Sequence, residues 1–308
     1  MASPDSWHEG ELHFQRLAGV PDSNLMRRAI MKTMPPVAME FISRQELAAF
    51  GTVDESGTPY AWVVAGPAGF LRAPTSDTLQ LSREALEALD PLFEEQLRLR
   101  PEIGTIVLEP RTRRRMRING RAAWGEDRQL VITASEVFSN CPKYIQTREP
   151  ATPWSKPPKL ERGQTRSTLN ATDLSLIERV DTFFIASRHS EAGVDISHRG
   201  GRPGFLRAVG ASRLRFPDYS GNNMFQTLGN LFVDDRAGLA LLDFEGGALL
   251  QVEGRAFVTE DPELVASFAG ARRVVELEVW SVTRSEWAGG ASWTLGEFSP
   301  ALPPESVG

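Results

Sequence analysis

The sequence has a single cysteine, Cys141, among 308 residues, which excludes an internal disulfide framework and a four-cysteine metal site. It has no excess of basic residues, because 34 Lys and Arg stand against 40 Asp and Glu, for a net charge of −6 and a pI of about 5.4. That balance lacks the positive field of a protein that coats nucleic acid, so no nucleic-acid partner is expected. No run approaches the ~18 uncharged apolar residues of a membrane span, so no membrane partner is expected either.

Targeting and metal-binding signals are also scarce. The first residues show no basic stretch followed by an apolar run, so we predict no signal peptide and expect a cytoplasmic protein. The four histidines show no ligand spacing, and we predict no metal site. What is present is ordinary globular composition, with 41% hydrophobic and 24% charged residues, and a length that suits about two domains.

The chain contains an internal repeat. Gly-Pro-Ala-Gly-Phe-Leu-Arg-Ala at 66–73 is matched by Gly-Arg-Pro-Gly-Phe-Leu-Arg-Ala at 201–208, at an offset of 135. Arg-Ile-Asn-Gly-Arg-Ala at 117–122 is matched by Gln-Val-Glu-Gly-Arg-Ala at 251–256, at an offset of 134. Matches in one order at nearly one offset indicate a tandem duplication.

A third match is spaced more widely. Glu-Val-Phe-Ser at 136–139 is followed by Glu-Val-Trp-Ser at 278–281, at an offset of 142. The extra eight residues can be placed at 261–270, where the sequence predicts a short inserted helix that ends at a glycine.

Both halves consist mainly of short strand-like runs bounded by turn residues, with fewer helical segments. This pattern predicts a mainly β fold with helices, built as two tandem antiparallel barrels. The segment at 149–170 contains four prolines and few aliphatic residues, which predicts a linker. The expected organisation is therefore an N-terminal helical arm at 1–40, a first barrel at 41–148, the linker, a second barrel at 171–298 and a tail at 299–308.

Two segments of the second half are candidates for ligand binding. The glycines of Ser-His-Arg-Gly-Gly-Arg-Pro-Gly at 197–204 allow close backbone approach, although a glycine-rich hairpin loop would have the same composition. The run at 218–224 leads into a helix expected to start near Asn222, where free N–H groups favour an anion such as phosphate. An ordinary capped helix start is the alternative, and Asp218 mildly disfavours an anion.

Two segments of the first half are also candidates. Cys141, Lys143 and Tyr144 close this half with a thiol, a cation and an aromatic donor, although a lone cysteine is more often a small buried hydrophobe. The run at 111–117 carries five arginines, of which four would share one strand face and contact a phosphate or an acidic substrate. A solvated edge strand is the alternative.

These segments together resemble the flavin-nucleotide-binding proteins related to pyridoxamine 5′-phosphate oxidase. The resemblance rests on SHRGGRPGFLR, FPDYSGNNM, LGNLFVDDRAGLALLDF and LQVEGRA in the second half, and on FSNCPKYIQ in the first. It implies two split β-barrels that form a pseudo-dimer within one chain, with FMN held in a cleft between them.

By position, the resemblance implies that 197–201 lie along the flavin ring and ribityl chain and that 219–224 hold the phosphate. The oxidase usually has Arg and Lys in that loop, so here the positive charge must come from elsewhere, with Arg199, Arg207 and the arginine-rich strand as candidates. The expected cofactor-binding residues are Ser197, His198, Arg199, Gly200, Gly201, Tyr219, Ser220, Gly221, Asn222, Asn223, Met224, Asn140, Cys141, Lys143, Tyr144 and Arg115.

The two halves are not equivalent. The segment at 83–95, which matches the phosphate segment at 218–230, has five carboxylates and one arginine and would repel a phosphate. Conversely, the segment at 282–287 lacks the Cys-Pro-Lys of the first half. We therefore expect one FMN per chain, in a monomer that is a pseudo-dimer or in a homodimer that shares its sites.

The expected function is an FMN-dependent oxidoreductase that acts on a small organic substrate, with catalytic residues unknown. Vitamin B6 oxidation is not favoured, because the oxidase's substrate-binding residues have no clear match. A non-catalytic flavin carrier or sensor is the main alternative, and a haem-handling split-barrel protein is a weaker one. His8 and Glu11 of the N-terminal arm are candidates to cap the pocket.

Overall fold

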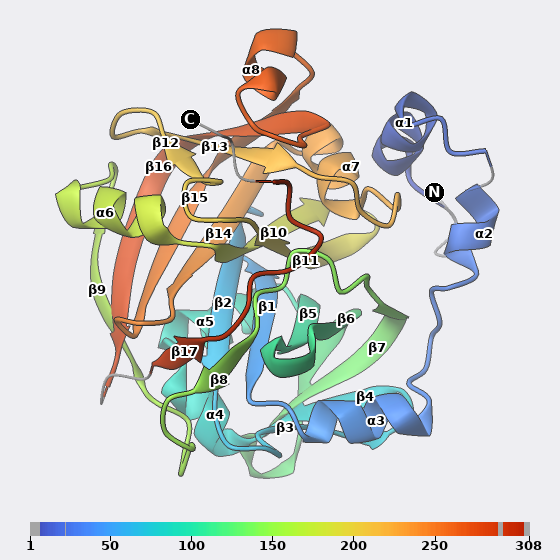
Figure 1. The fold of residues 1–308 in the computed structure, drawn as a ribbon. Coiled ribbons are helices and arrows are strands. Elements are labelled where there is room, and N and C mark those ends of the chain that lie inside the picture. The colour runs from blue at the N-terminus through green and yellow to red at the C-terminus, as the bar shows by residue number, and fades with distance from the viewer. Residues whose placement is uncertain (1–6, 22, 289–291, 305–308) are drawn as a thin grey trace.

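The computed structural model describes residues 7–21, 23–288 and 292–304. Three helices precede the first barrel: α1 (Glu9–Leu17), α2 (Ser23–Arg27) and α3 (Pro36–Ser43). The first barrel forms the lower part of the molecule in Figure 1 and the second barrel the upper part, beside which α1 and α2 also lie. The first barrel then contains β1 (Leu47–Val53), β2 (Pro59–Ala65), β3 (Leu71–Thr75), β4 (Thr78–Leu81), α4 (Arg83–Ala88), α5 (Pro91–Leu99), β5 (Glu102–Glu109), β6 (Arg114–Trp124) and β7 (Leu130–Ser139).

The second half repeats this order after two connecting strands. Its elements are β8 (Arg148–Pro150), β9 (Leu160–Arg166), α6 (Ala171–Arg179), β10 (Thr182–His189), β11 (Gly193–Gly200), β12 (Arg207–Ala208), β13 (Arg213–Asp218), α7 (Gln226–Val233), β14 (Arg236–Asp243), β15 (Ala248–Thr259), α8 (Pro262–Ala266), β16 (Arg273–Trp287) and β17 (Trp293–Leu295). Helix α8 is the inserted helix predicted between the last two barrel strands, and it projects from the barrel in Figure 1.

The two sheets have the same topology, which confirms the predicted pair of split barrels. The order β2-β1-β5-β6-β7-β4-β3 in the first half becomes β11-β10-β14-β15-β16-β13-β12 in the second. A β-bulge even recurs at matching places, between Asn119 and Gly120 on β6 and between Glu253 and Gly254 on β15. Because bulges are specific local features, their recurrence at equivalent positions of the two sheets supports the duplication independently of sequence identity.

The sheet register corrects one sequence match. Leu79 pairs with Ile132 in the first barrel, and its equivalent Leu214 pairs with Leu277 in the second. Ile132 of β7 therefore corresponds to Leu277 of β16, and on this register the match of 136–139 with 278–281 is wrong by three residues. The insertion that contains α8 is correspondingly longer than expected.

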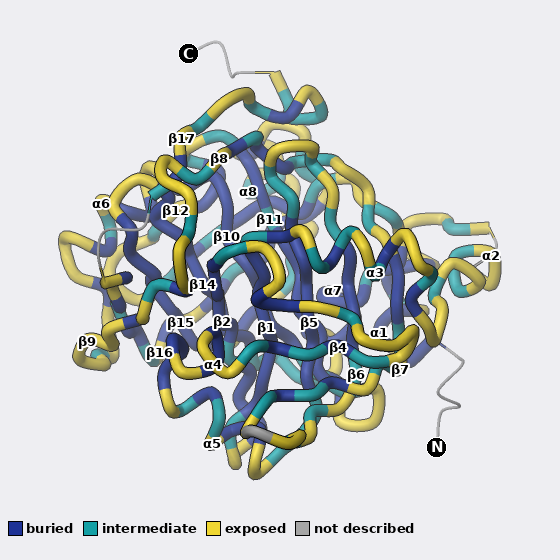
Figure 2. Tube along the Cα trace, turned by 90° about the horizontal axis from the view of Figure 1, so that it is seen from below, coloured by how far each residue is buried: buried dark blue, intermediate teal, exposed yellow. Residues whose placement is uncertain are grey.

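The barrels pack against each other through β1, β2 and β5 of one and β10, β11 and β14 of the other. Alternation along β1 explains this arrangement, because Phe50 enters the core of its own barrel while Ala49 enters the interbarrel core. A Cβ on Gly104 of β5 would lie 2.9 Å from the backbone nitrogen of Ile196, and one on Gly238 of β14 would meet Pro59. These matching contacts define a pseudo-two-fold interface, whose buried strands occupy the centre of Figure 2.

The segments outside the barrels differ from the predicted organisation. Residues 160–166, expected within a linker, form β9 and pair with β16, while β8 pairs with β17. Helix α3 packs on β3 and spans the expected boundary at residue 40, whereas α1 packs on α7 of the second barrel. The predicted arm and tail include residues 1–6, 22 and 305–308, which lie outside the described residues.

The arginine-rich segment does not form one continuous strand face. Residues 110–112 form a 3₁₀ turn and Arg113 has a left-handed φ of 57°, so β6 begins only at Arg114. Arg113 instead bonds the backbone carbonyl of Ile145, and Arg111 pairs with Glu149. Of the four arginines predicted to share one strand face, only Arg115 and Arg117 lie on β6 and line a site between the barrels. No helix among the described residues has the length and apolar character needed to cross a bilayer.

Candidate functional site

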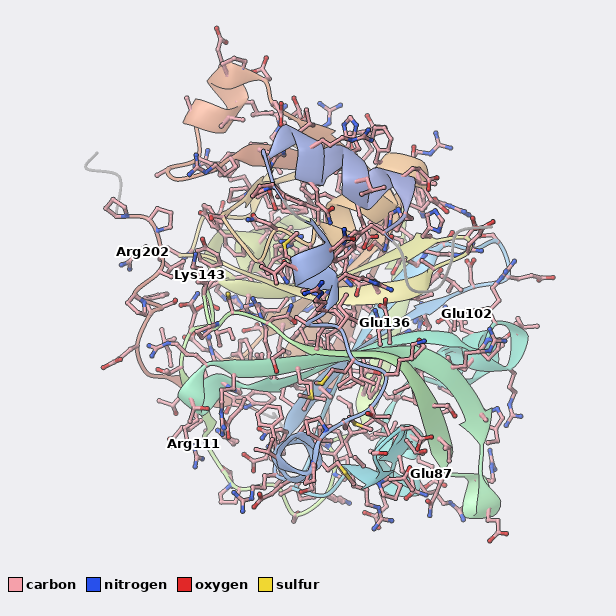
Figure 3. The ribbon with its side chains drawn as sticks, turned by 90° about the vertical axis from the view of Figure 1, so that its right-hand side faces the viewer. Glu87, Glu102, Arg111, Glu136, Lys143 and Arg202 are labelled. Carbon is pink, nitrogen blue, oxygen red and sulfur yellow. The ribbon has the colours of Figure 1, made fainter. Side chains whose placement is uncertain are left out.

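A cleft between the barrels brings together most of the residues predicted to bind a cofactor. It has a volume of about 100 Å³. Lys143 lies at the level between the two barrels in Figure 3. The predicted residues that line this cleft are Arg115, Asn140, Cys141, Lys143, Tyr144, Ser197, His198, Arg199, Gly200, Tyr219, Gly221, Asn222 and Asn223.

Three predicted residues do not line the cleft. The carbonyl of Gly201 accepts a hydrogen bond from the side chain of Gln146. A Cβ on Gly201 would clash with the side chain of Phe205. Ser220 is exposed and contributes only its carbonyl, which accepts from the hydroxyl of Tyr144 at 2.9 Å. Met224 is buried in a small apolar cluster that also contains Trp7.

The predicted helix start is also displaced. Helix α7 begins at Gln226, four residues after Asn222, because Asn223 and Phe225 adopt left-handed φ values of 60° and 59° that interrupt a helix. The segment at 219–224 is therefore an irregular loop in front of the helix. No side chain caps the first turn of α7. The backbone N–H groups of this turn lie at the N-terminal end of the helix, where an anion is favoured.

The strand β11 supplies one wall of the cleft. Ser197, His198 and Arg199 lie consecutively on it, and Gly200 ends it. A side chain at Gly200 would collide with the backbone carbonyl of Tyr144, so glycine allows the first-barrel segment that contains Tyr144 to approach this wall. The segment at 197–204, for which a glycine-rich hairpin loop was the alternative to a ligand-binding segment, is thus a regular strand through residue 200, followed by a turn.

Arg115 of β6 joins the two walls. Its Nη1 donates to Nδ1 of His198 at 2.8 Å. Burial, with Arg117 nearby, lowers the pKa of Arg115 to about 9. Burial and the charge of Arg115 together lower the pKa of His198 well below its ordinary value. His198 is therefore neutral near pH 7, and since Nδ1 accepts a bond, Nε2 carries the ring proton.

Arg117 is the centre of a buried hydrogen-bond network, although it was not among the expected cofactor-binding residues. Its Nη1 donates to Asp195 at 2.9 Å and to the side-chain oxygen of Gln226 at 2.6 Å, and its Nη2 donates to Ser197 at 2.6 Å. The Oγ of Ser197 also lies 2.7 Å from the hydroxyl of Thr227. In the sequence Arg117 is only one of five neighbouring arginines, and nothing there indicates that Asp195 lies opposite.

Asp218 is the one carboxylate that lines the cleft among the described residues. Burial raises its pKa, and two arginines oppose that rise, because Arg199 and Arg273 each lie 3.7 Å from its oxygens. Burial lowers the pKa of Arg199. The sequence indicates that the Asp218 carboxylate mildly disfavours an anion. In the structure this carboxylate is paired with Arg199 and Arg273.

The cleft presents several buried polar atoms that have no protein partner. Nε of Arg115, Arg117 and Arg199 and Nε2 of His198 are all in this state, and all four carry a hydrogen. Oδ1 of Asn140 is a single acceptor among them. Since buried polar groups are normally hydrogen-bonded, this set of donors indicates a ligand that is rich in acceptors or negatively charged.

The equivalent place in the other half of the pseudo-dimer is filled. Trp62, Val63 and Val64 on β2 occupy the positions of the three polar residues of β11, and Trp62 is fully buried. Leu249 stands where β6 has Arg115. Helix α4 replaces the loop at 219–224, and its Ser82 side chain caps it through the N–H of Ala85. The two halves are thus not equivalent, as the sequence indicates. At this place β11 of the second barrel carries polar side chains, and β2 of the first barrel carries apolar ones.

Neither His8 nor Glu11 lines the cleft. His8, the N-cap of α1, and Glu11 within that helix line a second cavity, together with residues of α2 and of both barrels. His8 and His189 line this cavity and form a group with the exposed Glu9 whose ligand atoms are within 4.8 Å; the wide separation of His189 from the other two along the chain hid this group in the sequence. Nδ1 of each histidine accepts backbone N–H groups and the rings stack at 4.3 Å, so their lone pairs do not converge on a cation.

The fold and the site define a protein of two tandem split β-barrels with one polar, donor-rich cleft between them. No protein-family model and no curated protein sequence matches the chain. Solved structures that it is similar to include HupZ from Group A Streptococcus, at 13% identity over 36% of this chain and 89% of that one, with a TM-score of 0.31. A candidate pyridoxamine 5′-phosphate oxidase from Lactobacillus delbrueckii matches at 15% identity over 40% and 98%, with a TM-score of 0.32.

A protein from Mesorhizobium loti described as FAD-binding matches at 11% identity, over 40% of this chain and 99% of that one, with a TM-score of 0.28. Each of these matches spans less than half of this chain and most of the matched chain.

Proposed function

We propose that this chain binds one FMN in the interbarrel cleft and acts as an FMN-dependent oxidoreductase on a small organic substrate. A bound flavin would supply the acceptance and return of a hydride or of single electrons. The observation that carries the proposal is the set of four unpartnered buried donors on Arg115, Arg117, Arg199 and His198. The edge of a flavin ring offers mainly acceptors and a single N–H, and Asn140 has the matching free acceptor.

The phosphate has a separate place in this proposal. The loop at 219–224 and the uncapped first turn of α7 supply backbone N–H groups and the amides of Asn222 and Asn223. Lys143 and Arg199 supply the positive charge that the loop itself lacks, and both line the same cleft. The phosphate would therefore be held mainly by neutral donors, with cations from the two walls.

The cleft must open for a flavin to enter. Its volume is about 100 Å³, less than the roughly 300 Å³ at the lower end of ligand pockets. Lys143 and Tyr144, which are only half-buried, lie in the segment that follows β7 and form one lip of the mouth. Ser299 holds this segment through the N–H of Tyr144, so opening is expected to involve their side chains more than the backbone.

His198 is proposed as a positioning donor rather than as an acid or base. It stays neutral near pH 7, because burial and Arg115 lower its pKa, and its Nε2–H points to a site without a protein acceptor. The same tautomer opposes the haem alternative, because an axial ligand needs a lone pair on that nitrogen. The donor set of the cleft therefore supports a flavin over haem.

A non-catalytic flavin carrier remains the second candidate, on one observation. Among the described residues of the cleft, none is placed as a proton acceptor for a substrate, because Asp218 is paired with arginines and His198 is neutral with Nδ1 occupied. A carrier requires no such group, and a hydride-transfer enzyme requires one only for some substrates.

Titration of the purified apoprotein with FMN tests the proposal. We expect one equivalent per chain, followed by the change of the visible flavin spectrum on binding, with sizing to distinguish a monomer from a site-sharing dimer. Arg115→Ala should weaken FMN binding at least about tenfold, because it removes a charged donor. Arg114→Ala is the matched control, since Arg114 is exposed on the other face of β6 and pairs with Glu109.

Two outcomes would contradict the proposal: two equivalent sites per chain, or no binding of FMN at all. Reduction of the bound flavin distinguishes the enzyme from the carrier. Bleaching by a reduced pyridine nucleotide or by a small organic donor supports the oxidoreductase, whereas a tight complex that none of them bleaches supports the carrier.

A further inference from the structure

The second cavity is separate from the cleft and has the opposite hydrogen-bonding character. It has a volume of about 410 Å³, within the range of ligand pockets. Glu136 and Glu102, which line it, lie at the level between the barrels in Figure 3, away from Lys143 in that view. Arg117, Asp195 and Gln226 are linked by hydrogen bonds, and this group stands between the two spaces, because Gln226 lines both.

Five carboxylates line this cavity: Glu11, Glu102, Glu136, Glu191 and Asp195. Asp195 is paired with Arg117 at 2.9 Å, Glu136 with Arg27 at 3.0 Å and Glu102 with Arg121 at 3.1 Å, and Glu191 is exposed. Glu11 of α1 is buried, and its only ion-pair contact among the described residues is with Nε2 of His8 at 3.6 Å. The cavity therefore contains one buried carboxyl group that forms no ion pair with a Lys or Arg of the described residues.

Asn119 supplies an independent sign of a ligand. Its Nδ2 donates to Glu136 and to Asp195, each at 3.2 Å, which fixes the orientation of the amide. Its Oδ1 is then an acceptor with no partner, on a residue that is 7% exposed and lines the cavity. An unpartnered buried acceptor in the same cavity as an unpaired carboxyl group favours a ligand that donates hydrogen bonds, and preferably a cationic one.

The remaining groups do not supply that donor. His8 is held neutral, because its Nδ1 accepts from the backbone of Gly10 and its Nε2 bonds Asn230 at 3.0 Å. His189 likewise accepts two backbone N–H groups at Nδ1. Of the cations on the rim, Arg121 is paired with Glu102 and largely exposed, and Lys32 is exposed.

We propose that this cavity is a binding site for a small organic ammonium ion, with Glu11 and the Oδ1 of Asn119 as its acceptors. The site is distinct from the cleft assigned to the flavin and does not depend on that assignment. A donor-lined cleft for an anionic ligand and an acceptor-lined cavity for a cationic one therefore lie on opposite sides of the Arg117–Asp195 pair.

Protonation gives the site a characteristic pH dependence. Burial raises the pKa of Glu11 to about 8, and Glu136 and Asp195 add to the rise, while the N–H of His8 and the charge of Arg27 oppose it. Near neutral pH, Glu11 therefore holds a proton that an ammonium ion has to displace. Affinity for an amine should rise between about pH 6.5 and 8, as that proton is lost.

Calorimetric titration of the full chain with benzylamine tests the proposal, with benzyl alcohol and benzoate as neutral and anionic counterparts of the same shape. We expect benzylamine to bind at least about tenfold more tightly than either counterpart. Glu11→Gln should weaken benzylamine at least about tenfold and remove the pH dependence. Glutamine preserves the capping box that Glu11 makes with His8, so α1 should stay folded.

Glu9→Gln is the control, because Glu9 lies on the same turn but is exposed and does not line the cavity. It should leave benzylamine affinity unchanged. Equal binding of benzylamine and benzyl alcohol, no binding of benzylamine at millimolar concentration, or unchanged affinity in Glu11→Gln would each overturn the proposal. FMN titration of the Glu11→Gln variant distinguishes a failure of this proposal from a failure of the proposed function, because FMN binding depends only on the cleft.

Discussion

Arg115 on β6 of the first barrel donates a 2.8 Å hydrogen bond to Nδ1 of His198 on β11 of the second. This contact fixes the tautomer of a buried histidine that lines the cleft, and its remaining N–H has no protein acceptor. Neither residue could form the site within its own barrel. The site therefore depends on how the two duplicated halves face each other.

Replacing His198 with valine, the residue at the matching position of β2, tests its role as a donor. We expect His198→Val to weaken FMN binding about tenfold, because a buried donor is lost. The melting temperature should fall as well, because Arg115 loses the acceptor of a buried hydrogen bond, although removal of the unsatisfied Nε2–H offsets part of that loss. FMN titration and thermal unfolding of the apoprotein measure the two effects, and unchanged FMN affinity would contradict the role of His198.

Replacing Arg117 with alanine should destabilise the fold. Asp195 would remain buried without its ion partner, which typically costs ~3–5 kcal/mol. Urea unfolding measures the loss. The double variant Arg117→Ala/Asp195→Ala is the control, and it should be more stable than the single variant, because no unpaired charge remains buried. A double variant that is less stable would show that the pair is not the cause.

A methyl group at Gly229 should displace α1 from α7. A Cβ there would lie 2.6 Å from the backbone nitrogen of Glu11, and a backbone atom cannot move away as the end of a flexible side chain can. Gly229→Ala should therefore cost roughly 1–3 kcal/mol and expose residues 9–17 to proteolysis. Gly221→Ala is the matched control, because its Cβ would meet no atom within 4 Å. Equal protection of α1 in both variants would refute the prediction.

Stability should fall as the pH rises from about 6.5 to 8. The pKa of Glu11 is raised to about 8 by burial, so in this range the folded state holds a proton that the unfolded chain has released. His8, whose pKa is lowered to about 4 by burial and by His189, acts only below this range. We expect a loss of roughly 2 kcal/mol across the range.

Urea unfolding at pH 6.5 and 8 measures this loss. Glu11→Gln should reduce it to the smaller part that comes from Glu253, because burial raises the pKa of Glu253 to about 7. Glu9→Gln should retain it, because Glu9 is exposed and its pKa is lowered rather than raised, first by a backbone hydrogen bond. Identical pH dependence in wild type and Glu11→Gln would show that another group is responsible.

Much of this molecule is determined by local sequence. The repeat at 66–73 and 201–208 predicted two barrels because duplicated turns and strands have to fold in the same way. The resemblance placed the segments at 140–144, 197–201 and 219–224 at one site. The structure brings the predicted residues of these segments together at a single cleft, except Gly201, Ser220 and Met224. Loss of polar residues from the matching segment of β2 is also a property of the sequence alone.

Other features depend on contacts that local sequence does not encode. The helix predicted at Asn222 begins at Gln226, because Asn223 and Phe225 adopt left-handed conformations in their tertiary setting. The register of β16 follows from pairing with β13 and β15, which overrides a chance match of four residues. The Arg117–Asp195 pair and the cavity at Glu11 join segments that lie far apart along the chain, because burial and charge pairing act between elements that only the folded chain brings together.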